Sequence, residues 1–279
     1  MGTLYLVATP IGNLEDISAR ALRILAQVRL IAAEDTRHTG KLLEYFKIHT
    51  PLTSYHEHNK LVKLDHILSV LEQGDVALVS DAGTPVLNDP GLELVRAVLD
   101  SGYTVSPIPG PSAPLAALIA SGLPTDAFLY LGYLPRKAGE RQKLLAGIQD
   151  LPFTLIFLEA PHRLLAALQD LVSVLGDRQI SVARELTKLH EELYRGSISQ
   201  ALAHFSAQPP RGEFTLVLAG YLPEVSIWSE EKLLGEVRAG LVKGEPGKRL
   251  AALLAEQSGW SRRKIYAMIL TAKEMAGDK

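Results

Sequence analysis

Short apolar runs alternate along the first half of the chain with segments whose apolar residues recur at helical spacing. The strand-like runs cover residues 4–7, 28–33, 76–79 and 104–105. Between them, apolar residues three or four positions apart predict helices that begin near Ser18, near Leu61 and after Asp89. This alternation predicts an α/β fold with a parallel sheet, because parallel neighbours need a crossover connection, usually a helix.

Loops rich in glycine and proline directly follow three of these strand-like runs. They cover residues 8–13, 80–85 and 107–113. In an open α/β sheet, small ligands bind at the carboxyl ends of the strands. Glycine permits a close approach of the backbone, and proline holds a turn rigid. The three loops therefore predict one crevice that holds a small cofactor.

The pattern changes near Gly122, and we expect a domain boundary there. The expected domains are an α/β domain over residues 1–122, a second and mixed α/β domain over 123–224, and a helical module over 225–279. Strand-like runs in the second domain cover residues 128–131, 153–158, 180–183, 191–194 and 214–218. Helices are predicted from about Lys137 and from Pro161, where proline suits a first helical position.

The last 55 residues lack strand signals and predict three helices. Ser229 is a plausible start for the first, and Gly259 marks a turn before the third. That third helix opens with Arg262, Arg263 and Lys264, and residues 229–279 carry 10 Lys and Arg against 7 Asp and Glu. Two interpretations fit: a helix-turn-helix whose second helix faces nucleic acid, or a three-helix cap with a solvated charged face.

Composition narrows the chemistry of the chain. Its 279 residues include no cysteine, which excludes disulfides, thiolate metal sites and a cysteine nucleophile, and fits the cytoplasm. No apolar run approaches the roughly 18 to 20 residues of a membrane span, and we expect no signal peptide. The first loop has one glycine, Gly12, and the sequence contains neither a dinucleotide-binding fingerprint nor a Walker A motif. We therefore expect a smaller ligand held by backbone and apolar contacts.

Five motifs in order along the chain carry a resemblance to a known family. They occupy residues 33–37, 56–59, 80–85, 159–163 and 183–188. Together they resemble the tetrapyrrole methylase superfamily, and within it the branch of small-subunit ribosomal RNA methyltransferases that modify a cytidine ribose 2′-hydroxyl. The resemblance implies two α/β domains that hold S-adenosylmethionine in the cleft between them, followed by the helical module. It also implies a homodimer that does not associate with a membrane. The expected partner is small-subunit ribosomal RNA, either naked or within an assembled subunit.

The same resemblance assigns eight residues to the cofactor. They are Pro10 in the first loop, Ala82, Gly83, Thr84 and Leu87 in and after the second, Ser112 and Ala113 in the third, and Leu158 at the end of a strand. Two rival functions remain open. A small-molecule methylase acting on a corrinoid or porphyrin would have the same fold, and a non-catalytic ribosome-binding factor could retain it.

Glu185 and Lys188 are the candidate catalytic residues, because they follow a strand expected to end at the cleft. A ribose hydroxyl is a weak nucleophile, so a general base, or a cation that stabilises the alkoxide, would assist its attack on the methyl group. The alternative is a surface ion pair between adjacent turns. No covalent intermediate is required, so alignment of the reacting atoms is the largest contribution the protein can make.

Several polar residues are candidates for binding the substrate. Asp35 and Arg37 follow the second predicted strand, although Asp35 could instead cap a helix. Arg136 and Lys137 lie in a basic segment that either contacts phosphate or is a solvated helix face. If residues 56–58 form a strand, the side chains of His56 and His58 lie on the same face and could bind a metal, but no third ligand is evident. We favour a polar loop that faces the substrate, with no metal.

Overall fold

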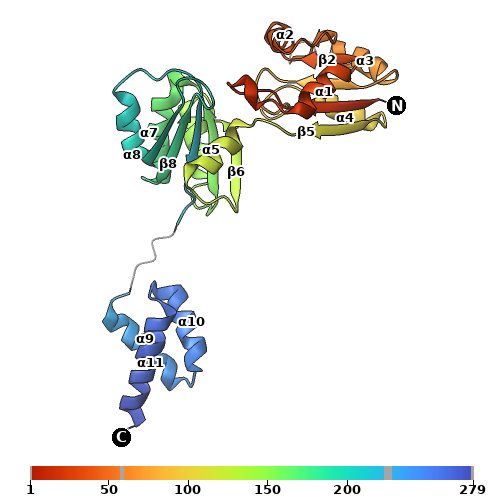
Figure 1. Ribbon diagram of the computed structural model, residues 1–279. Helices are drawn as coiled ribbons and strands as arrows, with labels where there is room; N and C mark the ends of the chain where they lie inside the picture. The colour runs from red at the N-terminus through yellow and green to blue at the C-terminus, as the bar shows by residue number, and fades with distance from the viewer. Residues whose placement is uncertain (1, 57–59, 223–227, 278–279) are drawn as a thin grey trace. The chain divides into compact units, whose positions relative to one another are not determined.

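The structure is a computed structural model that describes residues 2–56, 60–222 and 228–277. The chain forms two compact units, Met1–Tyr221 and Leu222–Lys279, and each is described by itself. The first unit contains two five-stranded sheets, and the second contains helices (Figure 1). Among the described residues, the helices are all too short or too polar to cross a membrane.

The first sheet is entirely parallel, as the alternation of strands and helices predicts. Its strand order is β3-β2-β4-β1-β5. The strands are β1 (Thr3–Val7), β2 (Leu30–Ala33), β3 (Leu52–Ser54), β4 (Val76–Val79) and β5 (Thr104–Ile108). The central strands β2 and β4 are buried at every position, because helices cover both faces of the sheet. The sequence pattern did not predict β3, an edge strand of three residues.

Four helices cover the two faces of this sheet. They are α1 (Ala19–Gln27), α2 (Thr36–Tyr45), α3 (Lys60–Leu71) and α4 (Leu92–Asp100). Leu25 and Leu43 pack on one face with apolar residues of α1 and α2, whereas Ile67 and Leu94 pack on the other with those of α3 and α4. Ser18 accepts a hydrogen bond from the Ala21 amide as the N-cap of α1, which confirms the predicted start of that helix.

The second sheet is mixed. Its order is β6-β7-β10-β8-β9, in which β6 and β7 are parallel and the other pairs antiparallel. The strands are β6 (Phe128–Tyr133), β7 (Thr154–Glu159), β8 (Gln179–Arg184), β9 (Glu192–Ser197) and β10 (Phe214–Leu218). The insertion of β10 between β7 and β8 brings residues 213–215 beside the end of β7, although they lie far away in sequence.

Helices also cover both faces of the second sheet. One face carries α6 (Ala138–Ala146), α7 (Leu164–Leu175) and α8 (Ile198–Ser206), and the other carries α5 (Ala113–Ser121). Ala117 and Leu118 of α5 pack against Ile156, Ala183 and Val217 of the sheet. The helix that precedes residue 122 in sequence therefore lies against the second sheet. Short 3-10 turns, Leu14–Asp16 and Pro161–Arg163, complete the unit.

The second unit is a three-helix module with its own core. It consists of α9 (Glu230–Val242), α10 (Gly247–Ser258) and α11 (Arg262–Gly277). Leu233, Leu254 and Ile265 are buried where the three helices meet. The side chain of Ser229 accepts a hydrogen bond from the Lys232 amide, which confirms the predicted start of α9. Gly259 ends α10 in the left-handed conformation before α11 begins.

Candidate active site

The three glycine- and proline-containing loops meet at the carboxyl edge of the first sheet. Thr9 and Gly83 exchange backbone hydrogen bonds of 2.9 and 3.0 Å, and the Thr84 hydroxyl donates to the Pro111 carbonyl over 3.1 Å. Gly83 has φ +80°, and an added Cβ would lie 3.3 Å from Ile11. Glycine suits this position because residues with a side chain rarely adopt its φ and because a Cβ would crowd Ile11.

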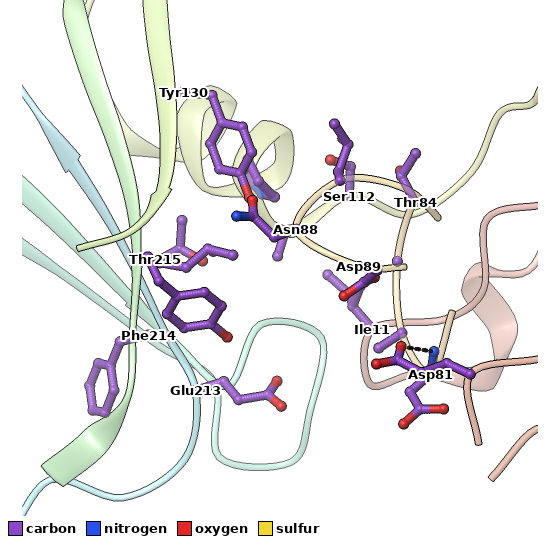
Figure 2. A pocket seen from close by; sticks show the side chains of 18 residues that line it. Ile11, Asp81, Thr84, Asn88, Asp89, Ser112, Tyr130, Glu213, Phe214 and Thr215 are labelled. Atoms are coloured by element: carbon purple, nitrogen blue, oxygen red, sulfur yellow. Dashed lines mark hydrogen bonds between the residues drawn. The ribbon is translucent and has the colours of Figure 1, made fainter. Parts of the chain in front are cut away.

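A pocket of about 260 Å³ lies where these loops face the second sheet (Figure 2). Seven of the eight residues expected to hold the cofactor line it: Ala82, Gly83, Thr84, Leu87, Ser112, Ala113 and Leu158. Figure 2 shows Asp81 and Asp89 on one side, and Tyr130, Thr215 and Glu213 on the other. The structure therefore brings residues from both halves of the first unit to one cavity.

Carboxylates give this pocket an acidic character. Glu34, Asp81 and Asp89 line one side, and the Asp81 amide lies 3.5 Å from Glu34 Oε2. Burial and the nearby charge of Glu34 raise the pKa of Asp89 to about 6. Burial and the charge of Asp81 also raise the pKa of Glu34. Because like charges gather in a partly buried space, the pocket favours a ligand that carries positive charge.

The opposite wall comes from β6 and from the start of β10. The Tyr130 hydroxyl donates to Asn88 Oδ1 over 2.6 Å and so ties β6 to the segment after β4. Gly132 has φ +64°, and an added Cβ would lie 2.3 Å from the Asn88 side chain. Burial raises the pKa of Tyr130 to about 12, so this hydroxyl keeps its proton as a donor. Asn88 therefore holds the two walls in register.

Unusual backbone conformations concentrate around this site. Among the described residues, the non-glycine positions with positive φ include Val86 at 74°, Asn88 at 65°, Glu185 at 50° and Thr187 at 65°. A β-branched residue such as Val86 rarely adopts this conformation. The surrounding contacts must impose it, and such strain is typical of binding sites.

A second pocket, of about 430 Å³, adjoins the first. It shares Ile11, Asp81, Ala82 and Glu213 with it. Pro10, the remaining residue expected at the cofactor, lines this second pocket together with Lys188 and one face of α2. The two cavities therefore lie on either side of the loop that follows β1.

Glu185 and Lys188 form an ion pair beside the second pocket. Lys188 Nζ lies 2.9 Å from Glu185 Oε1 and 3.0 Å from Glu213 Oε2. Burial alone would lower the pKa of Lys188, but its hydrogen bonds to both carboxylates outweigh this effect and raise the pKa. Burial would likewise raise the pKa of Glu185, but bonds from Lys188 and the Glu213 amide lower it. At neutral pH this site therefore presents an ammonium group held by two carboxylates.

The residues expected at the substrate lie outside the two pockets. Asp35 is the N-cap of α2, as the alternative interpretation has it, and accepts hydrogen bonds from the backbone and guanidinium of Arg37. The hydrogen bonds from Arg37 lower the pKa of Asp35. Lys137 precedes α6 and pairs with exposed Glu140 over 3.0 Å. Arg136 is exposed on the same turn.

Neither Arg141 nor His56 lines either of these two pockets. Arg141, which follows Arg136 and Lys137 in the basic segment, is buried and donates from Nε to Asp170 over 2.6 Å, so it is not part of a basic surface. Arg262, Arg263 and Lys264 open α11 of the second unit, are exposed, and stay predictions as RNA contacts. Of the motif at 56–59, residues 57–59 lie outside the described part of the chain.

Sequence reasoning missed several residues of the first pocket. Glu34 and Asp81 lie within recognised motifs, and their carboxylates were a usable signal. Asn88 and Asp89 come three and four residues after the second loop, so their position after β4 also pointed to the site. Tyr130, Tyr133 and residues 213–215 reach the pocket only through the topology of the second sheet. Local pattern could not have found them.

Comparison with known proteins places the chain in a family. Residues 3–202 match the model of the Tetrapyrrole (Corrin/Porphyrin) Methylases. A Synechocystis sp. protein named Ribosomal RNA small subunit methyltransferase I is 50% identical over 97% of this chain and 98% of its own. A Thermotoga maritima protein of the same name is 47% identical over 221 residues, which are 79% of this chain and 99% of its own.

A solved structure supports the same fold. The uroporphyrin-III C-methyl transferase from Thermus thermophilus, complexed with S-adenyl homocysteine, is 19% identical with a TM-score of 0.53. That match covers 77% of this chain and 97% of the solved one. The sequence matches identify the relationship, and the solved structure shows the same fold. The chain belongs to the tetrapyrrole (corrin/porphyrin) methylase family, and within it to the group of the ribosomal RNA small subunit methyltransferases I.

Proposed function

We propose that this protein transfers a methyl group from S-adenosylmethionine to the ribose 2′-hydroxyl of a cytidine in small-subunit ribosomal RNA. The observation that carries this proposal is the near full-length match to relatives named for ribosomal RNA small subunit methylation. The two adjoining pockets support it, because methyl transfer needs a donor and an acceptor side by side.

The first pocket suits the methyl donor on physical grounds. Its floor is backbone and small side chains at Ala82, Gly83 and Ala113, which leave room for a flat, extended ligand. Its carboxylates, at Glu34, Asp81 and Asp89, complement a positive charge. When bound, S-adenosylmethionine supplies an electrophilic methyl group on a positively charged sulfur. We place Pro10 at the border of this pocket, because it lies on the loop between the two cavities.

Lys188 is the proposed catalytic cation of the acceptor side. Its ammonium group can stabilise negative charge that develops on the attacking oxygen. Glu185, whose pKa is lowered, is a weak base, so we assign it the role of holding Lys188 in place. Asp81 and Glu213 line both pockets, and either carboxylate can accept the proton that the hydroxyl releases as the oxygen–methyl bond forms.

We expect exposed basic side chains to bind the parts of the RNA that lie away from the reacting nucleotide. Arg136 and Lys137, with Arg262, Arg263 and Lys264 of the helical module, would contact phosphates away from the reacting ribose. The guanidinium of Arg37 is exposed, and Asp35 would orient it toward the RNA through their ion pair. We also propose a homodimer that works in the cytoplasm, as the resemblance implies; light scattering of the purified protein tests the dimer.

Labelled cofactor tests the proposal directly. The full chain is incubated with tritiated S-adenosylmethionine and either small-subunit ribosomal RNA, assembled subunits or a tetrapyrrole. Label in a cytidine 2′-O-methyl nucleoside is expected, and mass spectrometry of ribosomal RNA from cells with and without the gene identifies the position. Label in the tetrapyrrole alone would refute the RNA substrate. No calorimetric binding of the cofactor at millimolar concentration would instead indicate a non-catalytic factor.

A further inference from the structure

One face of α2 carries polar and aromatic residues where the core-facing side of a helix would carry aliphatic ones. His38, Lys41, Leu42 and Tyr45 occupy positions i, i+3, i+4 and i+7, so they share one side of the helix, and all four line the second pocket. In most surface helices the buried row at this spacing is apolar. Here Lys41 is exposed and Tyr45 is 65% exposed.

Within this row Leu42 packs against the core of the first sheet, whereas Lys41 and Tyr45 are exposed. Thr39 and Leu43 are the buried residues of α2, and Phe46 packs against the same core beyond its end. The Phe46 ring meets the Tyr45 ring edge to face, with centroids 4.9 Å apart. The Tyr45 ring is therefore supported by Phe46 and exposed to solvent, and the exposed Lys41 lies one helical turn before it.

The residues of α2 that line the second pocket lie next to the first pocket, where they could hold an acceptor beside the methyl donor. Ile11, Asp81, Ala82 and Glu213 line both cavities, so a ligand in the second pocket lies directly beside a ligand in the first. Lys188, the proposed catalytic cation, also lines the second pocket. An acceptor held on α2 would thus have its reactive oxygen between Lys188 and the donor.

We infer that the second pocket receives the acceptor nucleotide in unpaired form, with its base stacked on Tyr45 and the adjoining phosphate on Lys41. This inference rests on the proposed function. Proteins that recognise RNA by sequence mostly bind single-stranded segments, whose unstacked bases stack on aromatic side chains. A lysine beside the ring provides the charge that a backbone phosphate requires.

Kinetics of methyl transfer to small-subunit ribosomal RNA test the inference in the full chain. Tyr45→Ala should lower kcat/KM by roughly 5- to 150-fold, whereas Tyr45→Phe, which keeps the ring, should stay within about twofold. Lys41→Gln should reduce the slope of log affinity against log salt by about 0.7, the value for one phosphate of a single strand. Calorimetry should give an unchanged affinity for S-adenosylmethionine in all three variants.

Leu99→Ala and Arg96→Gln are the matched controls, because both residues are exposed on α4, which covers the other face of the first sheet. If Tyr45→Ala behaves like Leu99→Ala while the wild type methylates RNA, the nucleotide pocket is wrong and the proposed function stands. Equal methylation of the target in a duplex and in a single strand would also overturn the unpaired form. A wild type that never labels RNA refutes both proposals.

Discussion

Replacement of Gly12 by alanine probes the contact between the loop after β1 and the turn after β8. A Cβ at this position would lie 2.4 Å from Lys188 Cγ, 2.8 Å from Thr187 Oγ1 and 2.9 Å from the Leu186 carbonyl oxygen. Favourable contacts between heavy atoms begin at about 3.5 Å, so the two segments must separate by about 0.5 to 1 Å. The hydrogen bond of 3.1 Å from the Asn13 amide to Thr187 Oγ1 would be strained as well.

The expected cost has two parts. Insertion of a methyl group into a filled contact destabilises proteins by about 1–3 kcal/mol. Displacement of Lys188 by about 1 Å from the reacting oxygen would lower kcat by up to about 100-fold, because the alignment of reacting groups depends on such distances. Gly12 lines the second pocket but not the first, so affinity for S-adenosylmethionine should change little.

The assay combines methyl transfer to small-subunit RNA, calorimetry of the cofactor and thermal unfolding. Gly139→Ala is the matched control, since Gly139 lies in α6 with no atom within 4 Å of an added Cβ. That substitution should raise helix stability by about 0.5–1 kcal/mol and leave kcat unchanged. Wild-type turnover in Gly12→Ala would refute the view that this contact positions Lys188. A parallel loss of cofactor affinity would show that the substitution disturbs the first pocket instead.

Three further predictions follow from charge and domain structure. Because the pKa of Asp89 is raised to about 6, its carboxylate becomes negatively charged as the pH rises through this range. Affinity for cationic S-adenosylmethionine should therefore increase from about pH 5 to about pH 7. Calorimetry should show a weaker pH dependence in Asp89→Asn, and the same pH dependence in the variant and the wild type would contradict this prediction. Asp170→Ala removes the carboxylate that pairs with the buried Arg141 guanidinium and should cost about 3–5 kcal/mol in urea unfolding, against less than about 1 kcal/mol for Glu140→Ala at an exposed pair. Truncation after Tyr221 should weaken RNA binding but leave cofactor binding unchanged; equal loss of both would make the helical module a structural cap.

The first half of the fold was readable from local pattern for a physical reason. Buried parallel strands such as Val76–Val79 are continuous apolar runs, and the glycine- and proline-containing loops mark their carboxyl ends. Helix starts at Ser18 and Ser229 were readable because side-chain capping is a local interaction. The short edge strand Leu52–Ser54 was not, because three residues are too few to show a period.

Only part of the site could be predicted from the sequence, because the other part depends on the order of strands in the second sheet. The loop residues at Ala82–Thr84 come from one segment of sequence, and they line the first pocket. Tyr130 and Glu213 come from strands whose order in the second sheet no local signal encodes. The ion pair of Glu185 with Lys188 was foreseen as one of two alternatives, but the participation of Glu213 needed the fold.

The lengths of the relatives bear on where the chemistry resides. The Thermotoga maritima relative aligns over 221 residues and is covered almost completely, and 221 is also the length of the first compact unit. That unit contains both pockets, the carboxylates and the Lys188 ion pair. The helical unit is built on a separate core, with Leu233, Leu254 and Ile265 buried among its own helices. We therefore predict that a chain truncated after Tyr221 retains donor binding and methyl transfer. The basic start of α11 would add RNA affinity, which high salt should remove first.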